Sequence, residues 1–449
     1  MLDAVLAFLP ITVLMVGALI TKRIAEMMVL ASVLGAVLVY REDFFSGFID
    51  MMYGALSNSS YQFVLIILIG FGGMIRLFQE SGALMGFSRI VSGFASGPRK
   101  PLLVAWAMAF VMFVDDYLST LAVSFSMKSI TDENRIPREH LAMQTNMMAA
   151  CLCVLIPFSS WTAFTVGLLS EQGMDFTGYV RAIPYMFYPL AAIILCLLTA
   201  AGVVPKVGVL RDSYRRVEGG GDVVPEEKGG SSLVDISTTD AQKESSALNA
   251  VLPVVVMVAV VLLCDNDLVH GLVAAVALQF VMYVGRHLMT VGEFVQNFFE
   301  GAKSMASLGI IIFFAFMLSA ANEKLGFFDY LIGGIGGTVP PELLPVLTFA
   351  VVAFATFATA AYWIMQVIAV PVFIPLAAAM GVDPSLVAAA IMSGVTLGCN
   401  CCFYADPVFM TSAGTGVSNM RLVRTTAPYA VLLAVLAAAG YVAAGFLTV

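Results

Sequence analysis

The chain has 449 residues, of which 60% are hydrophobic and only 12% are charged, whereas soluble domains carry roughly 25% charged residues. This composition and a mean hydropathy of +0.95 exclude a water-soluble enzyme built around one large core. A formal net charge of −8 also excludes a nucleic-acid-binding protein, because such proteins need clustered basic residues against phosphates. The composition therefore predicts a polytopic helical protein embedded in a lipid bilayer.

Apolar runs follow one another along the chain, and about 20 apolar residues suffice to cross the bilayer core as a helix. In the N-terminal half they fall near 4–20, 24–40, 60–78, 101–127, 140–170 and 183–203. In the C-terminal half they fall near 249–264, 268–285, 303–320, 343–380, 384–413 and 427–447. The first run follows Met1-Leu2-Asp3 without a basic region, so we expect a retained span rather than a signal peptide.

Between the halves, residues 205–248 have a different composition, with Gly219-Gly220-Gly221 and Pro225-Glu226-Glu227-Lys228. This segment cannot bury enough apolar surface to order itself, and we expect a solvated cytoplasmic linker. The predicted organisation is an N-terminal repeat over 1–204, the linker over 205–248 and a C-terminal repeat over 249–449.

The two halves follow one plan. Gln79-Glu80 ends the third run just as Asn322-Glu323 ends its counterpart, 243 positions later. Val180-Arg181 opens the last run of the first half, and Val423-Arg424 opens the last run of the second at the same offset. A constant offset with the same order of runs indicates an internal repeat, which is frequent in secondary transporters.

The placement of Lys and Arg predicts that the repeats are inverted. If runs 101–127 and 343–380 are re-entrant hairpins, only Arg41, Arg181 and Lys324 of the 22 basic residues fall on the minority face. This separation follows the positive-inside rule, with the N-terminus outside and the linker in the cytoplasm. The expected fold is an all-α membrane protein with two inverted repeats of five transmembrane helices and one hairpin each, and with broken helices at the midplane.

Polar, Gly and Pro residues interrupt four of the runs, which is typical of discontinuous helices. The hairpins are expected to turn at 113–118 and 357–363, and the fifth run of each half is expected to break at 156–161 and 398–407. Free carbonyls at such breaks can bind a cation, and half-helix N-termini can face an anion. We therefore expect the working site at these breaks.

Three carboxylates fall at the interruptions. Asp115 and Asp116 are adjacent in the first hairpin, and Asp406 directly precedes Pro407 at the second break. Each could simply cap a helix. Intramembrane carboxylates are nevertheless costly and usually functional, and two adjacent ones resist double ionisation unless a cation is bound. Asp115, Asp116 and Asp406 are the predicted cation or proton site.

Other chemistry has little support in the sequence. Cys399, Cys401 and Cys402 form a cluster without zinc-like spacing, so no metal site is expected. Nucleophile-elbow, metalloprotease and P-loop motifs do not occur in the sequence. The sequence therefore predicts neither enzyme activity nor a cofactor.

Several segments resemble the NhaC-type sodium/proton antiporter family, of which this chain looks like a divergent member. They are Asp115-Asp116-Tyr117 and residues 130–132, 135–142 and 153–161 in the first half, with residues 391–394, Gly398, Asp406, 412–413 and 428–430 in the second. The resemblance implies a scaffold domain and a moving transport domain that give alternating access by an elevator-like shift. It also implies a homodimer in the cell (inner) membrane.

The chain departs from this pattern at Asn146, where antiporter-like members usually carry Asp, and at Cys399-Asn400, where they carry an Asp-His pair. These neutral residues suit an organic solute better than a bare ion. We expect an Na⁺- or H⁺-coupled transporter of a small organic solute, such as an amino acid or carboxylate. The alternative is an Na⁺/H⁺ antiporter without an organic substrate, and a passive channel is disfavoured by the repeats. The residues expected to contact the solute are Asn146, Pro157, Ser159, Ser160, Thr359, Asn400 and Cys401.

Overall fold

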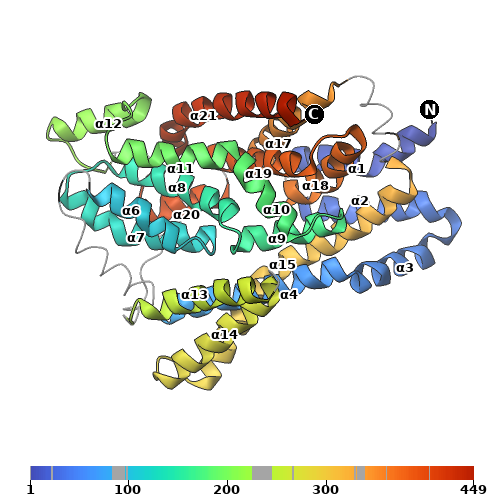
Figure 1. Cartoon of the computed structure of the whole chain (residues 1–449), viewed down its shortest axis with the longest axis horizontal. Helices are drawn as coiled ribbons and strands as arrows, with labels where there is room; N and C mark the ends of the chain where they lie inside the picture. Colours follow the sequence, from blue (N-terminus) through green and yellow to red (C-terminus); the bar gives the residue numbers. More distant parts are fainter. Residues whose placement is uncertain are drawn as a thin grey trace.

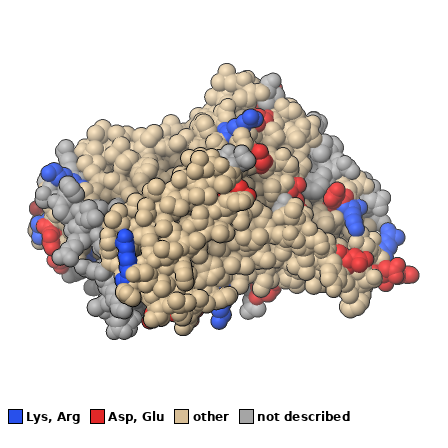
Figure 2. All heavy atoms as spheres, turned by 60° about the horizontal axis from the view of Figure 1, so that its bottom comes forward, with Lys and Arg blue, Asp and Glu red and all other residues tan. Residues whose placement is uncertain are grey.

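The computed structural model describes most of the chain, and every regular element that it describes is a helix. The described residues are 2–21, 24–82, 97, 100–224, 245–264, 267–327, 330, 339–360, 362–403 and 405–448. Most helices run along the long axis of the molecule (Figure 1). Figure 2 shows that most of the surface on this face carries no Lys, Arg, Asp or Glu side chain, and that the charged side chains lie in small separate groups. This arrangement is that of a multi-pass membrane protein.

The described helices contain six that are long and apolar enough to cross a membrane, or up to eight if each of two bent pairs is one span. This range is lower than the ten crossings expected from the sequence, and it includes α17 (Leu344–Thr359) and α18 (Tyr362–Met380), which were expected to form a hairpin rather than two crossings. One reason is length, because the expected crossings at 24–40 and 249–264 form helices of only 17 and 16 residues, shorter than the roughly 20 residues that span a bilayer core.

Two bundles make up the structure. The helices of the first bundle pack on one another around α4 and α15. They are α1 (Leu2–Thr21), α2 (Ile24–Tyr40), η1 (Arg41–Asp43), α3 (Phe44–Ser57), α4 (Ser59–Glu80), α13 (Leu248–Leu263), α14 (Leu268–Gly285) and α15 (Val291–Lys324). α15 begins before the apolar run at 303–320, because Thr290 and Glu293 form a capping box at its N-terminus.

The second bundle packs around α8 and α19. Its elements are α6 (Lys100–Val111), α7 (Asp116–Glu133), α8 (Arg138–Leu155), α9 (Ser160–Glu171), α10 (Phe176–Ala182), η2 (Ile183–Tyr185), α11 (Phe187–Ala200), α12 (Gly208–Glu218), η3 (Pro341–Leu343), α17 (Leu344–Thr359), α18 (Tyr362–Met380), α19 (Pro384–Cys401), α20 (Asp406–Thr415) and α21 (Asn419–Thr448). The two bundles meet where α9 packs on α4 and α18 packs on α15.

The helix interruptions expected from the sequence fall where predicted. α17 and α18 are each long and apolar enough to cross a membrane, so the re-entrant course of the hairpins stays a prediction. α6 and α7 are joined by residues 112–115, and α17 and α18 by residues 360–361. α8 and α9 meet at an angle of 43°, because Pro157 lacks an N–H and holds the preceding Ile156 in an extended conformation. α19 and α20 are separated by residues 402–405, and Pro407 lies in the first turn of α20.

The linker expected over 205–248 contains a helix, which corrects the expectation that this composition would not order itself. Over α12, Leu210, Ser213 and Val217 are buried on one face, and their spacing of three and four residues is that of an amphipathic helix. α12 packs on α21 and α8. Residues 225–244 of the linker lie outside the described part of the chain.

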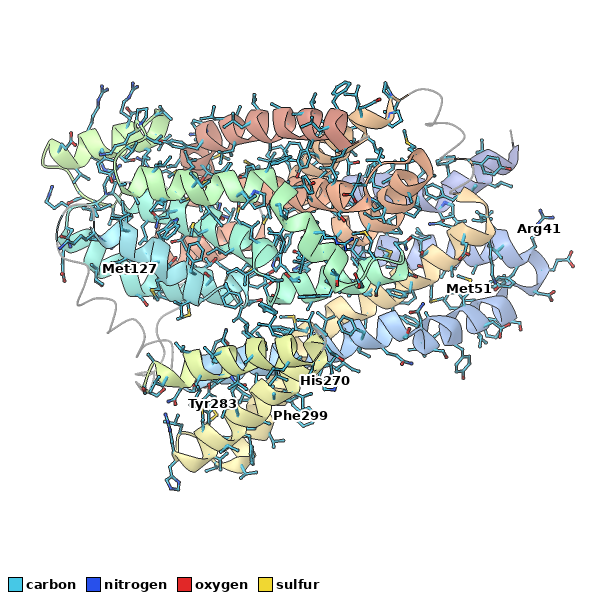
Figure 3. All side chains as sticks on the ribbon, viewed as in Figure 1. Arg41, Met51, Met127, His270, Tyr283 and Phe299 are labelled. Carbon is cyan, nitrogen blue, oxygen red and sulfur yellow. The ribbon has the colours of Figure 1, made fainter. Side chains whose placement is uncertain are left out.

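Basic residues assigned to the two predicted charge faces lie toward different ends of the molecule, and the membrane orientation of these faces stays a prediction. Arg41, from the face with few basic residues, lies at one end, and Met127, next to Lys128, lies toward the other (Figure 3). α12, with its basic residues Arg211, Arg215 and Arg216, lies at the same end as Met127 (Figures 1 and 3).

α4 and α15 cross with their backbones in close contact. A Cβ atom built on Gly72 would lie 2.4 Å from the carbonyl oxygen of Gly301, and one built on Gly301 would lie 2.1 Å from that of Gly72. Small residues at such crossings allow the backbones of membrane helices to approach each other. No side chain fits at either position without a displacement of the helix.

Replacing Gly72 with alanine is therefore expected to destabilise the protein by about 1–3 kcal/mol, the usual cost of overpacking. A shift in the thermal unfolding of the detergent-solubilised protein would measure this effect. Gly54→Ala in α3 is the control, because its added Cβ would have no atom within 4 Å and alanine favours a helix. Equal melting temperatures for the two variants would contradict close packing at Gly72.

Candidate functional site

The connection of the first hairpin lies directly against the break between α8 and α9. The backbone N–H of Ser160 donates to the carbonyl of Val114 at 2.9 Å, and Cys153 Sγ donates to the carbonyl of Phe113 at 3.1 Å. The tip is thus fixed to the broken helix by its own backbone. The sequence predicted that the site lies at the tips and breaks, but not which tip contacts which break.

Asp115 and Ser160 form a direct polar contact at this junction. Asp115 is 2% exposed, and its Oδ2 accepts a hydrogen bond from Ser160 Oγ at 3.1 Å. A buried carboxylate that receives hydrogen bonds can hold a cation when its other oxygen positions are open. Two residues predicted separately, one for the ion and one for the solute, are therefore in contact.

Asp116 is the first residue of α7 and is fully buried. The Trp161 side chain and the backbone N–H groups of Asp116 and Tyr117 lie near its carboxylate. Among the described residues, neither carboxylate oxygen of Asp116 accepts a hydrogen bond of normal geometry. Because buried polar atoms are normally hydrogen-bonded, these oxygens are available to a proton or a cation.

Tyr117 connects the two halves of the chain at the tips. Its hydroxyl forms a hydrogen bond with that of Tyr362 at the start of α18, and it donates to Asp406 Oδ2 at 3.3 Å. Asp406 is the first residue of α20 and is exposed. The three predicted aspartates thus lie in one region, but within the described residues no three His, Cys, Asp or Glu side chains are grouped closely enough to hold one metal ion.

An aromatic layer lies behind the aspartates. The Trp161 ring stacks on Tyr362 with centroids 5.1 Å apart and an interplanar angle of 10°, and it also contacts Trp363 at 5.1 Å. Trp161 is fully buried. This packing holds α9 against α18 and fixes the position of the tyrosine that contacts Tyr117.

Asn146 and Asn400 form a second polar group in the interior of the second bundle. Asn146 Nδ2 donates to the carbonyl of Asn400 at 3.2 Å, and Asn400 Nδ2 donates to the hydroxyl of Tyr188 at 3.2 Å. Both side chains are fully buried. Their Oδ1 atoms receive no hydrogen bond from any described residue.

The remaining predicted residues lie at helix ends and make local contacts. Ser159 caps α9 by accepting from the N–H of Thr162 at 3.1 Å, and its hydroxyl donates to the carbonyl of Cys153. Thr359, at the end of α17, donates to the carbonyl of Ala355 at 2.7 Å. Pro157 and Cys401 are half-buried at the first break and at the end of α19.

A cavity of about 300 Å³ lies between the first hairpin tip and the first bundle. Asp115 and Tyr117 line one side of it, and α4 and α15 line the other. The residues contributed by these two helices are Gly72, Ile75, Arg76, Gln79, Glu300, Gly301 and Met305. This volume is at the small end of the range for ligand pockets, roughly 300–1,000 Å³.

The sequence interpretation missed Arg76, Gln79, Glu300, Tyr117 and Tyr362 as site residues. Arg76 was detectable, because it is a charged residue inside the apolar run at 60–78, and such residues are functional candidates by default. Tyr117 belongs to the quoted Asp115-Asp116-Tyr117 motif, but only the fold brings it to Tyr362 and Asp406. No sequence pattern places Glu300 next to Asp115.

Comparison with known families gives one match over most of the chain. The model of the Na⁺/H⁺ antiporter family matches residues 152–446, about two thirds of the sequence. This match confirms the resemblance to NhaC-type antiporters. An uncharacterized protein of Haemophilus influenzae is 24% identical over 492 aligned positions, which cover 99% of this chain and 91% of that protein.

Two solved structures have similar folds. The YdaH transporter of Alcanivorax borkumensis, whose crystal structure is described as having an unusual topology, aligns with a TM-score of 0.64 at 16% identity, covering 91% of this chain and 89% of that one. MtrF of Neisseria gonorrhoeae aligns with a TM-score of 0.50 at 12% identity, covering 89% of this chain and 83% of that one. At these identities the similarity concerns the fold.

Proposed function

The chain belongs to the Na⁺/H⁺ antiporter family, and from this premise we propose that it couples Na⁺ or H⁺ movement to the transport of a small organic solute by alternating access. The family and the structurally similar proteins are transporters rather than enzymes. The observation that carries the proposal is the cavity of about 300 Å³ that reaches Asp115. Water occupies roughly 30 Å³ in the liquid, so this volume exceeds what a bare cation needs.

The coupling cation or proton is assigned to Asp115 and Asp116. Their burial and adjacency support this assignment, because two ionised carboxylates side by side in a protein interior are stabilised by a cation or by a shared proton. Asp406 participates through its hydrogen bond from Tyr117, the residue that follows the pair. Asn146 and Asn400 remain proposed as solute contacts, since their side-chain oxygens receive no hydrogen bond from the described residues.

The solute is placed between the bundles, next to the first tip. Ser160 contacts this region through Asp115. Pro157, Ser159, Thr359 and Cys401, at the breaks and the second tip, are proposed as further solute contacts.

Alternating access in this proposal is an elevator-like movement of the second bundle along the first. The halves are inverted repeats, with hairpin α6–α7 entering from one face and α17–α18 from the other; their placement toward opposite ends of the molecule supports this (Figure 1). By the positive-inside rule, the N-terminus is outside and the linker is in the cytoplasm of the cell (inner) membrane. The first bundle is the scaffold, and two copies associate as a homodimer.

An organic solute has some support from a structurally similar protein, because MtrF is described as illuminating a class of antimetabolite efflux pumps. The alternative is an Na⁺/H⁺ antiporter without an organic substrate, which the family description favours. Both mechanisms use the same aspartates. They differ in whether ion movement requires a solute.

Transport assays on reconstituted protein distinguish a solute-coupled transporter from an Na⁺/H⁺ antiporter without an organic substrate. Proteoliposomes that enclose a pH-sensitive dye are given an inward Na⁺ gradient, with and without mixtures of amino acids or carboxylates. We expect ion movement that depends on a solute and saturable counterflow of that solute. An Na⁺-evoked pH change that no solute alters would establish the alternative, and protein-free liposomes measure the leak.

A further inference from the structure

We infer that the cavity between the first hairpin and the first bundle binds a zwitterionic α-amino acid, with Arg76 binding the carboxylate and Glu300 binding the ammonium group. This inference rests on the proposed transport function and specifies its solute. It adds to the site two charged residues of the first bundle, whereas the predicted site residues all belong to the second. The solute would then be held between the part that moves and the part that does not.

Arg76 lines the cavity from α4 and has an N–H donor that no acceptor among the described residues uses. Its Nη2 pairs with Glu80 Oε1 at 2.7 Å within α4, whereas its buried Nε has no acceptor among the described residues. A guanidinium carries five N–H donors in a fixed fork that matches a carboxylate. A buried donor without an acceptor is unfavourable. A carboxylate in the cavity would therefore stabilise Arg76 by accepting a hydrogen bond from its Nε–H.

Glu300 supplies the opposite charge on the adjacent helix. It lines the same cavity from α15, its side chain is exposed, and it takes part in none of the ion pairs between described residues. α4 and α15 cross closely at Gly72 and Gly301. Arg76 on α4 and Glu300 on α15 therefore line the same cavity.

The charges of the lining match an amino acid better than an ion of one sign. Once Asp115 is neutralised by the coupling cation, the charged groups that line the cavity are Arg76, which also pairs with Glu80 within α4, and Glu300. An anionic solute would have to approach Glu300, and an organic cation would have to approach Arg76, and each such encounter between like charges is unfavourable. A zwitterion satisfies both groups, and the limited volume favours a small side chain.

Ligand-induced thermal stabilisation tests this inference, because a ligand that binds only the native state raises its stability by mass action. The purified full chain is heated in NaCl with each standard L-amino acid in turn. For any amino acid that stabilises the protein, its carboxamide and its N-acetyl derivative are then compared, since each lacks one of the two charges. We expect stabilisation by at least one small amino acid and by neither of its derivatives.

Two variants test whether Arg76 binds the carboxylate of the amino acid and Glu300 binds its ammonium group. In Arg76→Gln, apparent affinity for the amino acid should fall at least about tenfold, as expected for the loss of a hydrogen bond to a charged group, and discrimination against the carboxamide should disappear. In Glu300→Gln, affinity should fall similarly, and discrimination against the N-acetyl derivative should disappear. These opposite patterns distinguish binding from a general loss of structure.

Matched controls are available on the same helices. Glu80→Gln removes the salt-bridge partner of Arg76 but keeps Arg76, and exposed pairs contribute little to stability. Glu293→Gln retains the capping box of α15, because Gln serves there as well as Glu. Both controls should respond to the amino acid as the unmodified chain does.

The outcomes separate this inference from the proposed function. Stabilisation by a dicarboxylate or an amine but by no amino acid, or unchanged affinity in both Arg76→Gln and Glu300→Gln, would overturn the zwitterion assignment and leave coupled solute transport intact. Na⁺-evoked pH changes that respond to no solute would overturn both.

Discussion

Asp115→Asn is expected to lower the rate of coupled transport by about a hundredfold or more, which corresponds to losing one partner of a buried charge pair. Asp115 is 2% exposed, accepts a hydrogen bond from Ser160 and lines the cavity. Asparagine has nearly the same shape and can still accept from Ser160, but it carries no charge with which to bind Na⁺ or exchange a proton. Initial rates of solute uptake into proteoliposomes under an imposed ion gradient measure the effect.

Asp383→Asn is the matched control for this variant. Asp383 caps α19, where it accepts from the N–H of Ser385 at 2.9 Å, and asparagine is an equally good capping residue. We expect the control to transport and to unfold like the unmodified chain, and Asp115→Asn to unfold like it too. Transport at the normal rate by Asp115→Asn would remove Asp115 from the coupling site.

The breaks and tips of this fold could be predicted from the sequence because their causes are local. Pro157 and Pro407 interrupt helices through the geometry of their own rings, and Asp115 and Asp116 stand out against a chain that is only 12% charged. The linker helix α12 could not be predicted from local features in the same way. The composition of 205–248 is polar on average, whereas α12 buries a narrow face through only a few residues.

The lining of the cavity could not be predicted in the same way, because it depends on which helices pack together. Arg76 and Glu300 are more than 200 positions apart, and they face one cavity only because Gly72 and Gly301 allow α4 and α15 to cross closely. The contact of Tyr117 with Tyr362 likewise joins residues from different halves. The predicted solute contacts at Asn146 and Asn400 stay predictions, and in the structure these residues hydrogen-bond to each other.

A separate charged cluster holds the linker helix on the second bundle. Glu139, in the first turn of α8, has a fully buried side chain that accepts two hydrogen bonds from Arg216 of α12, at 2.9 and 3.0 Å. It also accepts one from Arg421 of α21 at 2.7 Å. Nearby, Tyr214 of α12 contacts His140 Nδ1 at 2.8 Å, and burial raises the pKa of its hydroxyl, which stays neutral.

Glu139→Gln is expected to destabilise the protein by about 3 kcal/mol, the lower end of the range for breaking a buried ion pair. Glutamine offers one acceptor and places its NH₂ group against guanidinium donors. The loss in free energy of unfolding stays at the lower end of this range, because the Arg216 and Arg421 side chains are 24% and 27% exposed and can regain some hydration. A lower melting temperature and faster cleavage by trypsin after Arg211 and Arg215 measure the loss of stability and the release of α12.

Glu133→Gln is the matched control, because Glu133 is exposed in the last turn of α7, near the same end of the molecule. It should change neither the melting temperature nor the cleavage rate. If Glu139→Gln lowered the melting temperature without faster cleavage of α12, Glu139 would stabilise α8 and α21 without holding the linker. If neither quantity changed, the cluster would contribute no net stability, and apolar packing of Leu210 and Val217 would account for the position of α12.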